Sequence, residues 1–266
     1  MQVIQISVVG LSALMASACF ADEFSTDWAA SAKSKARLVA ADDSLAGFEI
    51  RLAPGAITYW RDPGDAGAPP TFDFSGSDNV AKVEPIFPAP KRIAEPDGSE
   101  AFGYGDGIVL PLRIERRDPA KTVTLAVHAN YAVCERICLP AEARLKLTLP
   151  GAASPYAALV EAALASAPRP VPPKEFGDLS SDGDGWRLCA PHEAGESRDL
   201  FVEAPEGWRI AAEPAPNDAS RDCFRLTLLE KPKDAGLPVA LRMTMTGGQG
   251  PIETTIEAVI EAVRPR

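Results

Sequence analysis

A chain of 266 residues with a formal net charge of −10 can form one or two globular domains, and it has no cationic excess with which to neutralise nucleic-acid phosphates. Its 46% hydrophobic and 24% charged residues exclude wholesale disorder. The 25 prolines disfavour long helices and favour an all-β fold. With two histidines, a three-histidine zinc site is excluded.

Residues 1–21 carry no Lys, Arg, Asp or Glu, and the apolar run from Val3 to Leu14 is followed by small residues. This pattern predicts a secretory signal peptide, cleaved after Ala18 or Ala21. A retained anchor and a lipid attached to Cys19 are the alternatives. No later segment is apolar enough to span a membrane, so we expect a soluble mature protein outside the cytoplasm.

Residues 22–150 are predicted to form a first β-domain. The segment TVTLAVHANYAV alternates strictly between apolar and polar residues, and ARLKLTLP repeats the pattern. Such alternation is typical of antiparallel strands that cover one side of a core. The predicted inward residues are Val123, Leu125, Val127, Ala129, Tyr131, Val133, Leu145, Leu147 and Leu149. Several short strands over about 120 residues favour an immunoglobulin-like sandwich.

Residues 151–174 interrupt the strand pattern. SPYAALVEAALASA predicts a short helix capped by Ser154, and PRPVPPK predicts a stiff extended linker. Strand-like runs resume in residues 175–266, which predict a second, smaller β-domain. The expected fold class is therefore all-β, with two immunoglobulin-like β-sandwich domains joined by a helix and a Pro-rich linker.

Export leaves an even number of cysteines in a compartment where disulfides persist. Cys134 and Cys138 flank a tight connection between the two best strands. Closing a ring of about five residues stabilises a fold by only ~2 kcal/mol, so this bond can be reduced at modest cost. A reversible dithiol, a static disulfide, and a copper(I) or zinc site completed by His128 are the three interpretations of this pair.

Cys189 and Cys223 lie in strand-like runs and are too far apart in sequence for a redox turn motif. A structural disulfide is predicted for them, with two free buried thiols as the alternative. Over their span of about 35 residues, a disulfide contributes ~3.8 kcal/mol in the loop-entropy model. Asp62, Asp65 and their neighbours fit turn chemistry rather than a calcium loop, so no metal site and no cofactor is predicted.

YAVCERICLPAEARL resembles the active-site strands of the N-terminal periplasmic domain of the thiol:disulfide interchange protein DsbD. YWRDPGDAGAPPTFDFSGSDNV and FGYGDGIVLPLRI are similar to the branch of ScsB, the suppressor-of-copper-sensitivity protein. The resemblance covers about residues 28–150. It implies an immunoglobulin-like domain in the periplasm that carries electrons by thiol–disulfide exchange.

The resemblance also implies residue roles. Cys138 would be the sulfur that exchanges with partners, and Cys134 the resolving one. An aromatic loop shields the pair in the family, and Phe102 and Tyr104 are the candidates for it here. The expected partners are a thioredoxin-like or membrane-embedded electron donor and periplasmic acceptors that contain disulfides, each a separate protein.

The first hypothesis is therefore an exported electron-shuttle protein, which would act as a thiol:disulfide oxidoreductase without a cofactor. The rival is a non-catalytic periplasmic binding or copper-handling module in which Cys134 and Cys138 form a structural disulfide. The sequence leaves the reactivity of the pair open, because Arg136 favours a thiolate and Glu135 opposes it.

Overall fold

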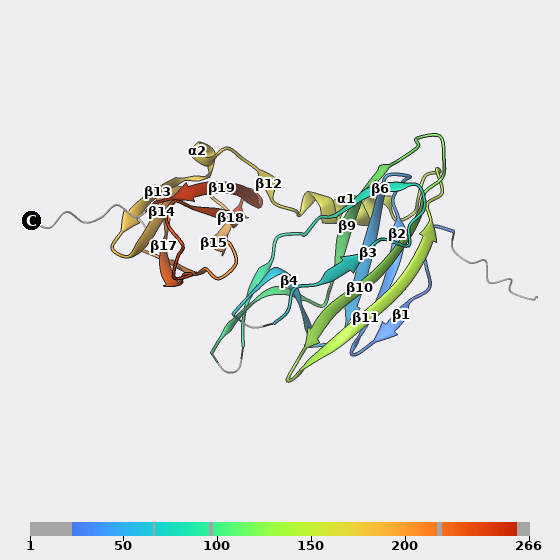
Figure 1. The fold of residues 1–266 in the computed structure, drawn as a ribbon, viewed down its shortest axis with the longest axis horizontal. Coiled ribbons are helices and arrows are strands. Elements are labelled where there is room, and N and C mark those ends of the chain that lie inside the picture. The colour runs from blue at the N-terminus through green and yellow to red at the C-terminus, as the bar shows by residue number, and fades with distance from the viewer. Residues whose placement is uncertain (1–22, 66, 96–97, 217–219, 260–266) are drawn as a thin grey trace, which may run out of the picture.

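The computed structural model describes residues 23–259, apart from residues 66, 96–97 and 217–219. The predicted signal peptide and Cys19 lie outside the described residues. The fold is all-β, as predicted, with four sheets that pack as two immunoglobulin-like sandwiches (Figure 1). We call the strands β1–β11 the first sandwich and β12–β19 the second sandwich. No helix in the described residues is long and apolar enough to cross a membrane.

The first sandwich contains two sheets. In spatial order, one consists of β1 (Ala29–Ser31), β2 (Ser34–Ala40), β3 (Leu45–Leu52), β9 (Gly107–Arg116) and β6 (Val80–Pro85). The other consists of β11 (Cys138–Thr148), β10 (Thr124–Cys134), β4 (Ile57–Gly64), β8 (Glu100–Gly105) and β7 (Lys91–Ala94), with β5 (Thr71–Asp73) paired to β10.

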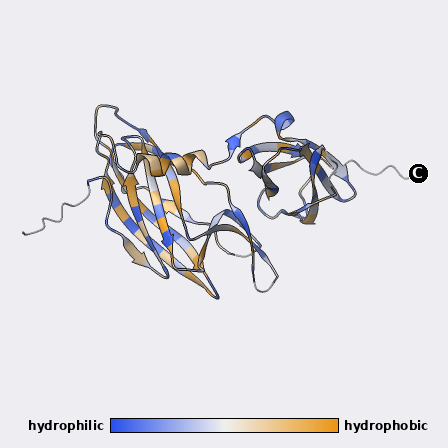
Figure 2. Cartoon of the chain, turned by 180° about the vertical axis from the view of Figure 1, so that it is seen from behind, coloured by the Kyte–Doolittle hydropathy of each residue, from blue (hydrophilic) through white to orange (hydrophobic). Residues whose placement is uncertain are grey.

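The predicted alternation on β10 is confirmed. Every second side chain from Val123 to Val133 is buried against Leu38, Phe48 and Leu112 of the facing sheet. Each fully buried large aliphatic or aromatic side chain contributes about 1.5–3 kcal/mol. Figure 2 shows hydrophobic segments along the strands of both sandwiches. The core thus fixes the register of β10 and β11, whose connecting turn carries the cysteine pair.

The second sandwich is smaller. One sheet has the order β12 (Arg169–Pro170), β19 (Ile252–Ala258), β18 (Val239–Gly248) and β15 (Glu196–Glu203). The other has the order β13 (Asp178–Asp182), β14 (Gly185–Pro191), β17 (Arg221–Glu230) and β16 (Arg209–Pro214). Trp186, Leu188, Leu200 and Leu241 lie in the core between them.

Helix α1 (Ala157–Ala165) lies between the two sets of strands, and the short helix α2 (Pro173–Phe176) lies between β12 and β13 of the second sandwich. Val160 of α1 packs against Val39 and Ala41 of the first sandwich. Ser154 does not cap α1: the N-cap residue is Tyr156, and the Ser154 hydroxyl accepts a hydrogen bond from the Tyr156 backbone N–H. Within the predicted linker, Arg169–Pro170 pairs with β19. The predicted domain bounds 22–150, 151–174 and 175–266 remain a proposal.

The two sandwiches contact each other through β4, β7 and β8 on one side and β15, β16 and β19 on the other. Phe201 packs edge-on against Trp60 and Phe102, with the Phe102 ring centroid 4.9 Å away. Arg61 binds Glu203 at 2.7 Å and also Glu253. Burial alone would raise the pKa of Glu253, but the guanidinium groups of Arg242 and Arg61 lower it. The contact is thus an aromatic cluster bordered by partly buried ion pairs.

Replacing Arg61 by methionine should reduce the free energy of unfolding by about 2 kcal/mol. The change leaves the carboxylates of Glu203 and Glu253, which are largely buried, with the more exposed Arg242 as their cationic partner. A buried carboxylate that loses a cationic partner destabilises the folded state. Thermal unfolding should show a midpoint lower by about 5 °C. Arg225→Met is the matched control: Arg225 is exposed and its carboxylate partner is 3.9 Å away, so its loss should change stability by less than about 1 kcal/mol. Equal shifts for the two variants would contradict this view of the contact.

Candidate functional site: the cysteine pair at the β10–β11 turn

Cys134 and Cys138 form a disulfide at the turn of the longest hairpin of the first sandwich. They are the last residue of β10 and the first of β11, and they stand opposite each other in the strand register. Their Cα atoms are 4.1 Å apart. Because the core holds both strands in register, the two sulfurs should remain close when the bond is reduced.

The two cysteines differ in exposure. Cys134 is only 3% exposed and packs against Tyr59 and Ala101. Cys138 is exposed, and the adjacent Ile137 is 67% exposed at the end of the hairpin. A protein partner can therefore approach Cys138 from solvent. Cys134 faces the interior of the protein, so the group that can react with it is the neighbouring sulfur of Cys138.

Tyr59 is the aromatic residue that contacts the disulfide. Its strand β4 pairs with the end of β10, with Ile57 opposite Cys134. The Tyr59 hydroxyl donates a hydrogen bond of 2.8 Å to Cys134 Sγ and lies 3.3 Å from Cys138 Sγ. Burial and, secondarily, the carboxylate of Glu95 raise the pKa of Tyr59. The phenol therefore keeps its proton at neutral pH and remains a donor to sulfur.

The backbone at Gly67 covers the Tyr59 ring. Gly67 has φ +111°, and a Cβ atom added there would lie 2.3 Å from Tyr59 Cε1. Only glycine fits so close to the ring in this conformation. Asp65, at the start of the same segment, is bound by Arg209 of the second sandwich at 2.7 Å. Gly67 therefore covers the ring of the tyrosine that contacts the disulfide.

The predicted shielding residues Phe102 and Tyr104 lie elsewhere. Both are on β8, and they share a cluster with Trp60 and Phe201 on the opposite face of the sheet from Tyr59. The Tyr104 hydroxyl donates a hydrogen bond of 2.8 Å to the Pro88 carbonyl. In the part of the chain that the structure describes, the buried cluster around Cys134 includes Tyr59 and not these two residues. Their role as a shield therefore stays a prediction without a contact to support it.

The charges at the turn have a net positive balance. The Glu135 carboxylate is bound by Lys33, and that hydrogen bond and charge lower the pKa of Glu135. Since Lys33 compensates Glu135, the exposed guanidinium of Arg136 is left as the excess charge two residues from Cys138. A nearby cation lowers the pKa of a thiol, so the turn favours the thiolate when the disulfide is reduced.

A metal site that combines both thiolates with His128 does not fit the geometry. His128 is six residues before Cys134 on the same continuous strand, which places it about 20 Å away at the usual rise per residue. Its Nε2 atom lies 3.1 Å from Glu142 Oε1. Zinc–ligand distances are about 2 Å, so His128 and the sulfurs cannot share one ion. Among the described residues, no group of three His, Cys, Asp or Glu side chains is arranged to hold a metal.

The second disulfide joins Cys189 on β14 to Cys223 on β17, directly opposite each other in one sheet. Cys223 is buried, and its neighbours on β17 contribute to the core of the second sandwich. The predicted pairing of these cysteines is thus present, and its structural role is a proposal.

Known proteins similar to this chain include thiol:disulfide interchange proteins. Residues 23–150 match the family model described as thiol:disulfide interchange protein DsbD, N-terminal. The crystal structure of the N-terminal periplasmic domain of ScsB from Proteus mirabilis matches with a TM-score of 0.72 and 19% identity, over 90% of this chain and 100% of that one. No curated protein matches the chain. Residues 23–150, which contain the cysteine pair and the strands that hold it, therefore form a domain of the DsbD N-terminal family.

Proposed function

We propose that the protein is a periplasmic thiol–disulfide exchange protein that passes electrons through Cys134 and Cys138. The reduced Cys138 thiolate attacks a disulfide of an acceptor and forms a mixed disulfide, while the second acceptor sulfur leaves as a thiolate and takes up a proton. The Cys134 thiolate then attacks the Cys138 sulfur. The internal disulfide re-forms, and the acceptor leaves with two electrons and two protons.

The difference in exposure between the two sulfurs carries this proposal. The exposed Cys138 suits attack on a partner, and the buried Cys134, which accepts a hydrogen bond from Tyr59, suits resolution. The positive balance at the turn supports the thiolate that exchange requires. The family of residues 23–150 includes a thiol:disulfide interchange protein, which supports the same chemistry.

After each cycle the pair is oxidised and must be reduced again. We propose a thioredoxin-like or membrane-embedded donor for this step, and periplasmic proteins with disulfides as acceptors. No cofactor is needed, because each step exchanges one S–S bond for another. Location in the periplasm follows from the predicted signal peptide and from the family, and it belongs to the same proposal.

The reduction potential separates this function from a structural disulfide in a binding or copper-handling module. Exchange-active disulfides have potentials above about −300 mV, whereas structural ones usually lie below this value. Equilibration of the protein with glutathione or dithiothreitol buffers, followed by thiol alkylation and mass spectrometry, measures the potential. A value below about −300 mV for Cys134–Cys138 would favour the structural role.

Graded reduction should open Cys134–Cys138 well before Cys189–Cys223. Both bonds join paired strands, but the first includes the exposed Cys138 and closes a small ring, whereas the second joins a partly buried and a buried cysteine and closes a large one. Peptide mapping after increasing dithiothreitol concentrations gives the order of opening. Equal resistance of the two bonds would contradict the division into an exchanging and a structural disulfide.

A further inference from the structure

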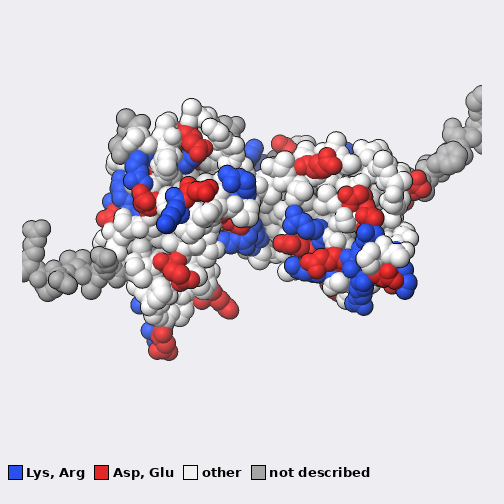
Figure 3. All heavy atoms as spheres, turned by 90° about the horizontal axis from the view of Figure 1, so that it is seen from above, with Lys and Arg blue, Asp and Glu red and all other residues white. Residues whose placement is uncertain are grey.

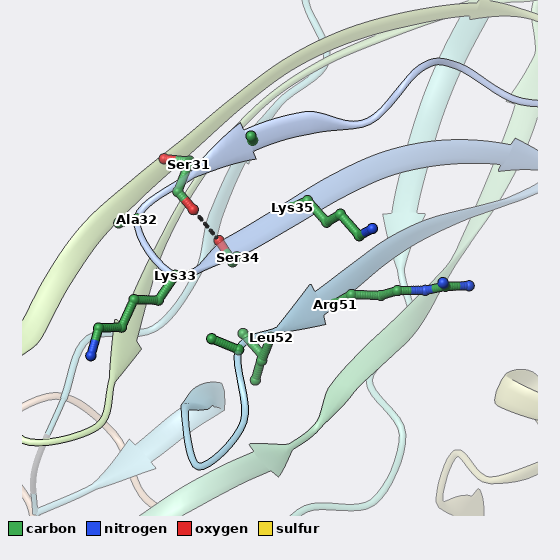
Figure 4. Close-up of a pocket in the computed structure, with 9 residues that line it drawn as sticks. Ser31, Ala32, Lys33, Ser34, Lys35, Arg51 and Leu52 are labelled. Atoms are coloured by element: carbon green, nitrogen blue, oxygen red, sulfur yellow. Dashed lines mark hydrogen bonds between the residues drawn. The ribbon is translucent and has the colours of Figure 1, made fainter.

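A groove of about 610 Å³ lies beside the hairpin turn that joins β1 to β2. Its walls come from Ala30–Lys35 and from residues 51–53 at the end of β3. The floor is largely apolar, with Ala30, Ala32 and Leu52. Figure 4 shows Lys35 and Arg51 extending from adjacent strands toward the same side, while Lys33 extends past the turn in another direction. We call this feature the Lys35–Arg51 groove.

The groove is positively charged in a protein whose net charge is −10. Lys33, Lys35 and Arg51 line it, and no carboxylate does. The carboxylates that form ion pairs with these cations are Glu49, which binds both Arg37 and Arg51, and Glu135, which binds Lys33. These four cations and two carboxylates together leave two positive charges. Elsewhere, as on the face in Figure 3, acidic and basic side chains are mixed.

The two main cations are held in place by an aromatic ring. Lys35 Nζ and the Arg51 guanidinium each lie 4.8 Å from the centre of the Trp28 ring. Such contacts hold exposed cationic side chains in a defined position and reduce the entropy lost when they bind an anion. Both side chains are exposed, so their charged groups are accessible to an anionic ligand that passes over the groove.

The groove is continuous with the cysteine turn. Lys33, at one end of the groove, binds Glu135 of the turn. At the same end, the Ala53 N–H donates a hydrogen bond of 2.7 Å to the Lys33 carbonyl, and the chain runs on through a tight turn to Ile57, which stands opposite Cys134. The adjacent Ser34 hydroxyl lies 2.9 Å from the Tyr131 hydroxyl on β10. A peptide chain attached to Cys138 can therefore extend directly into the groove.

From this continuity and charge, we propose that the Lys35–Arg51 groove binds an extended acidic segment that flanks the reactive cysteine of the acceptor protein. The inference rests on the proposed function. While Cys138 and the acceptor are joined by the mixed disulfide, carboxylates of the segment pair with Lys35 and Arg51. Small apolar side chains lie over Ala32 and Leu52. The groove would select acceptors by charge and increase the rate of encounter.

Short peptides test the groove. Each carries one cysteine as a 2-pyridyl disulfide, flanked by a run of aspartates, asparagines or lysines. Attack by reduced Cys138 on the peptide sulfur forms the mixed disulfide and releases pyridine-2-thione, whose absorbance gives the rate. At low salt the aspartate peptide should react about fivefold faster than the asparagine peptide, and the lysine peptide more slowly than both. At about 1 M salt, where the Debye length is about 3 Å, the rates should converge.

The variant Lys35→Gln/Arg51→Gln should lose the preference for aspartate, with a rate ratio close to one. Glu49 keeps Arg37 as a partner in this variant, so the buried carboxylate is not left unpaired. Should the double variant not fold by circular dichroism, Lys35→Gln alone should reduce the ratio in part. Lys146→Gln is the matched control: it removes the same charge from an exposed position eight residues along β11 from Cys138, and the ratio should not change.

Uncharged 2,2′-dithiodipyridine distinguishes failure of the groove from failure of the proposed function. If the reduced protein reacts with it and closes the Cys134–Cys138 disulfide, but the three peptides react equally at low salt, the groove proposal is overturned alone. If this reagent does not lead to the internal disulfide, both proposals are overturned. An equal loss of preference in Lys146→Gln would also overturn the groove, because the effect would then reflect net charge.

Discussion

Replacing Cys134 by alanine should trap the protein in mixed disulfides with its partners. The exposed Cys138 still attacks, but the thiol that resolves the mixed disulfide is gone, so the covalent intermediate accumulates. Non-reducing gels of cell extracts should show adducts that dithiothreitol removes, and mass spectrometry should identify both donor and acceptors. We expect at least about tenfold more adduct than for the wild type, in which the neighbouring thiol resolves each intermediate quickly.

Cys138→Ala is the matched control for this trap. Its remaining thiol, Cys134, is 3% exposed and faces Tyr59, so a partner cannot reach it without local opening. It should yield far fewer adducts than Cys134→Ala. If the two variants trap partners equally, the roles of the two sulfurs are not divided as proposed. If neither traps any, and the wild-type pair stays oxidised in cells, a structural disulfide is the better interpretation.

The cysteine hairpin could be predicted from the sequence because its signal is local. Strict alternation on two neighbouring segments specifies the buried face, and the short connection between them places Cys134 opposite Cys138. Likewise, the strand-like runs in residues 175–266 predict a second, smaller β-domain, and β13–β19 lie in this range. The pairing of Cys189 with Cys223 agrees with the expected link between strands.

The surroundings of the disulfide could not be predicted in the same way, because they depend on which strands become neighbours. Tyr59 and Trp60 are adjacent in sequence and point to opposite faces of β4. Only the pairing of Ile57 with Cys134 decides that Tyr59 faces the sulfurs and Trp60 faces the second sandwich. From sequence alone, an aromatic residue in a strand, such as Tyr59, is more often a core residue than part of a site. Once the strand order is known, Tyr59 can be assigned to the site, because it lies two residues after Ile57, which pairs with Cys134, and therefore on the same face of β4 as Ile57.

The same dependence explains the positions of Phe102 and Tyr104. Because Phe102 and Tyr104 are two residues apart on β8, their side chains lie on the same face of the sheet. This spacing does not determine which face that is. Gly103, between them, approaches the Thr58 carbonyl so closely that an added Cβ would lie 2.1 Å from its oxygen. This close pairing of β8 with β4 directs the two aromatic rings toward Phe201. Phe201 is about 100 residues away in sequence. The contact with the second sandwich thus uses the aromatic residues that the family resemblance assigned to the shield of the disulfide.

Tyr59→Phe should make the disulfide harder to reduce without disturbing the fold. In the reduced protein, the Tyr59 hydroxyl can donate to the Cys134 thiolate, and a hydrogen bond to a charged group contributes about 1.5–3 kcal/mol. Without it, the pKa of the Cys134 thiol should rise by about one unit. At a pH where this thiol is ionised, the potential should become more negative by about 30 mV, since 1.4 kcal/mol corresponds to that shift.

Tyr104→Phe is the control for this change, because it removes the same atom from a buried tyrosine on the opposite face of the sheet. Its hydroxyl binds the Pro88 carbonyl, so the variant should lose about 1 kcal/mol of stability and keep its potential. Thiol titration by ultraviolet absorbance and equilibration with glutathione measure the two quantities. A shift of the same size in both variants would show that the potential responds to sheet stability. A shift confined to Tyr59→Phe assigns it to the hydrogen bond at Cys134 Sγ.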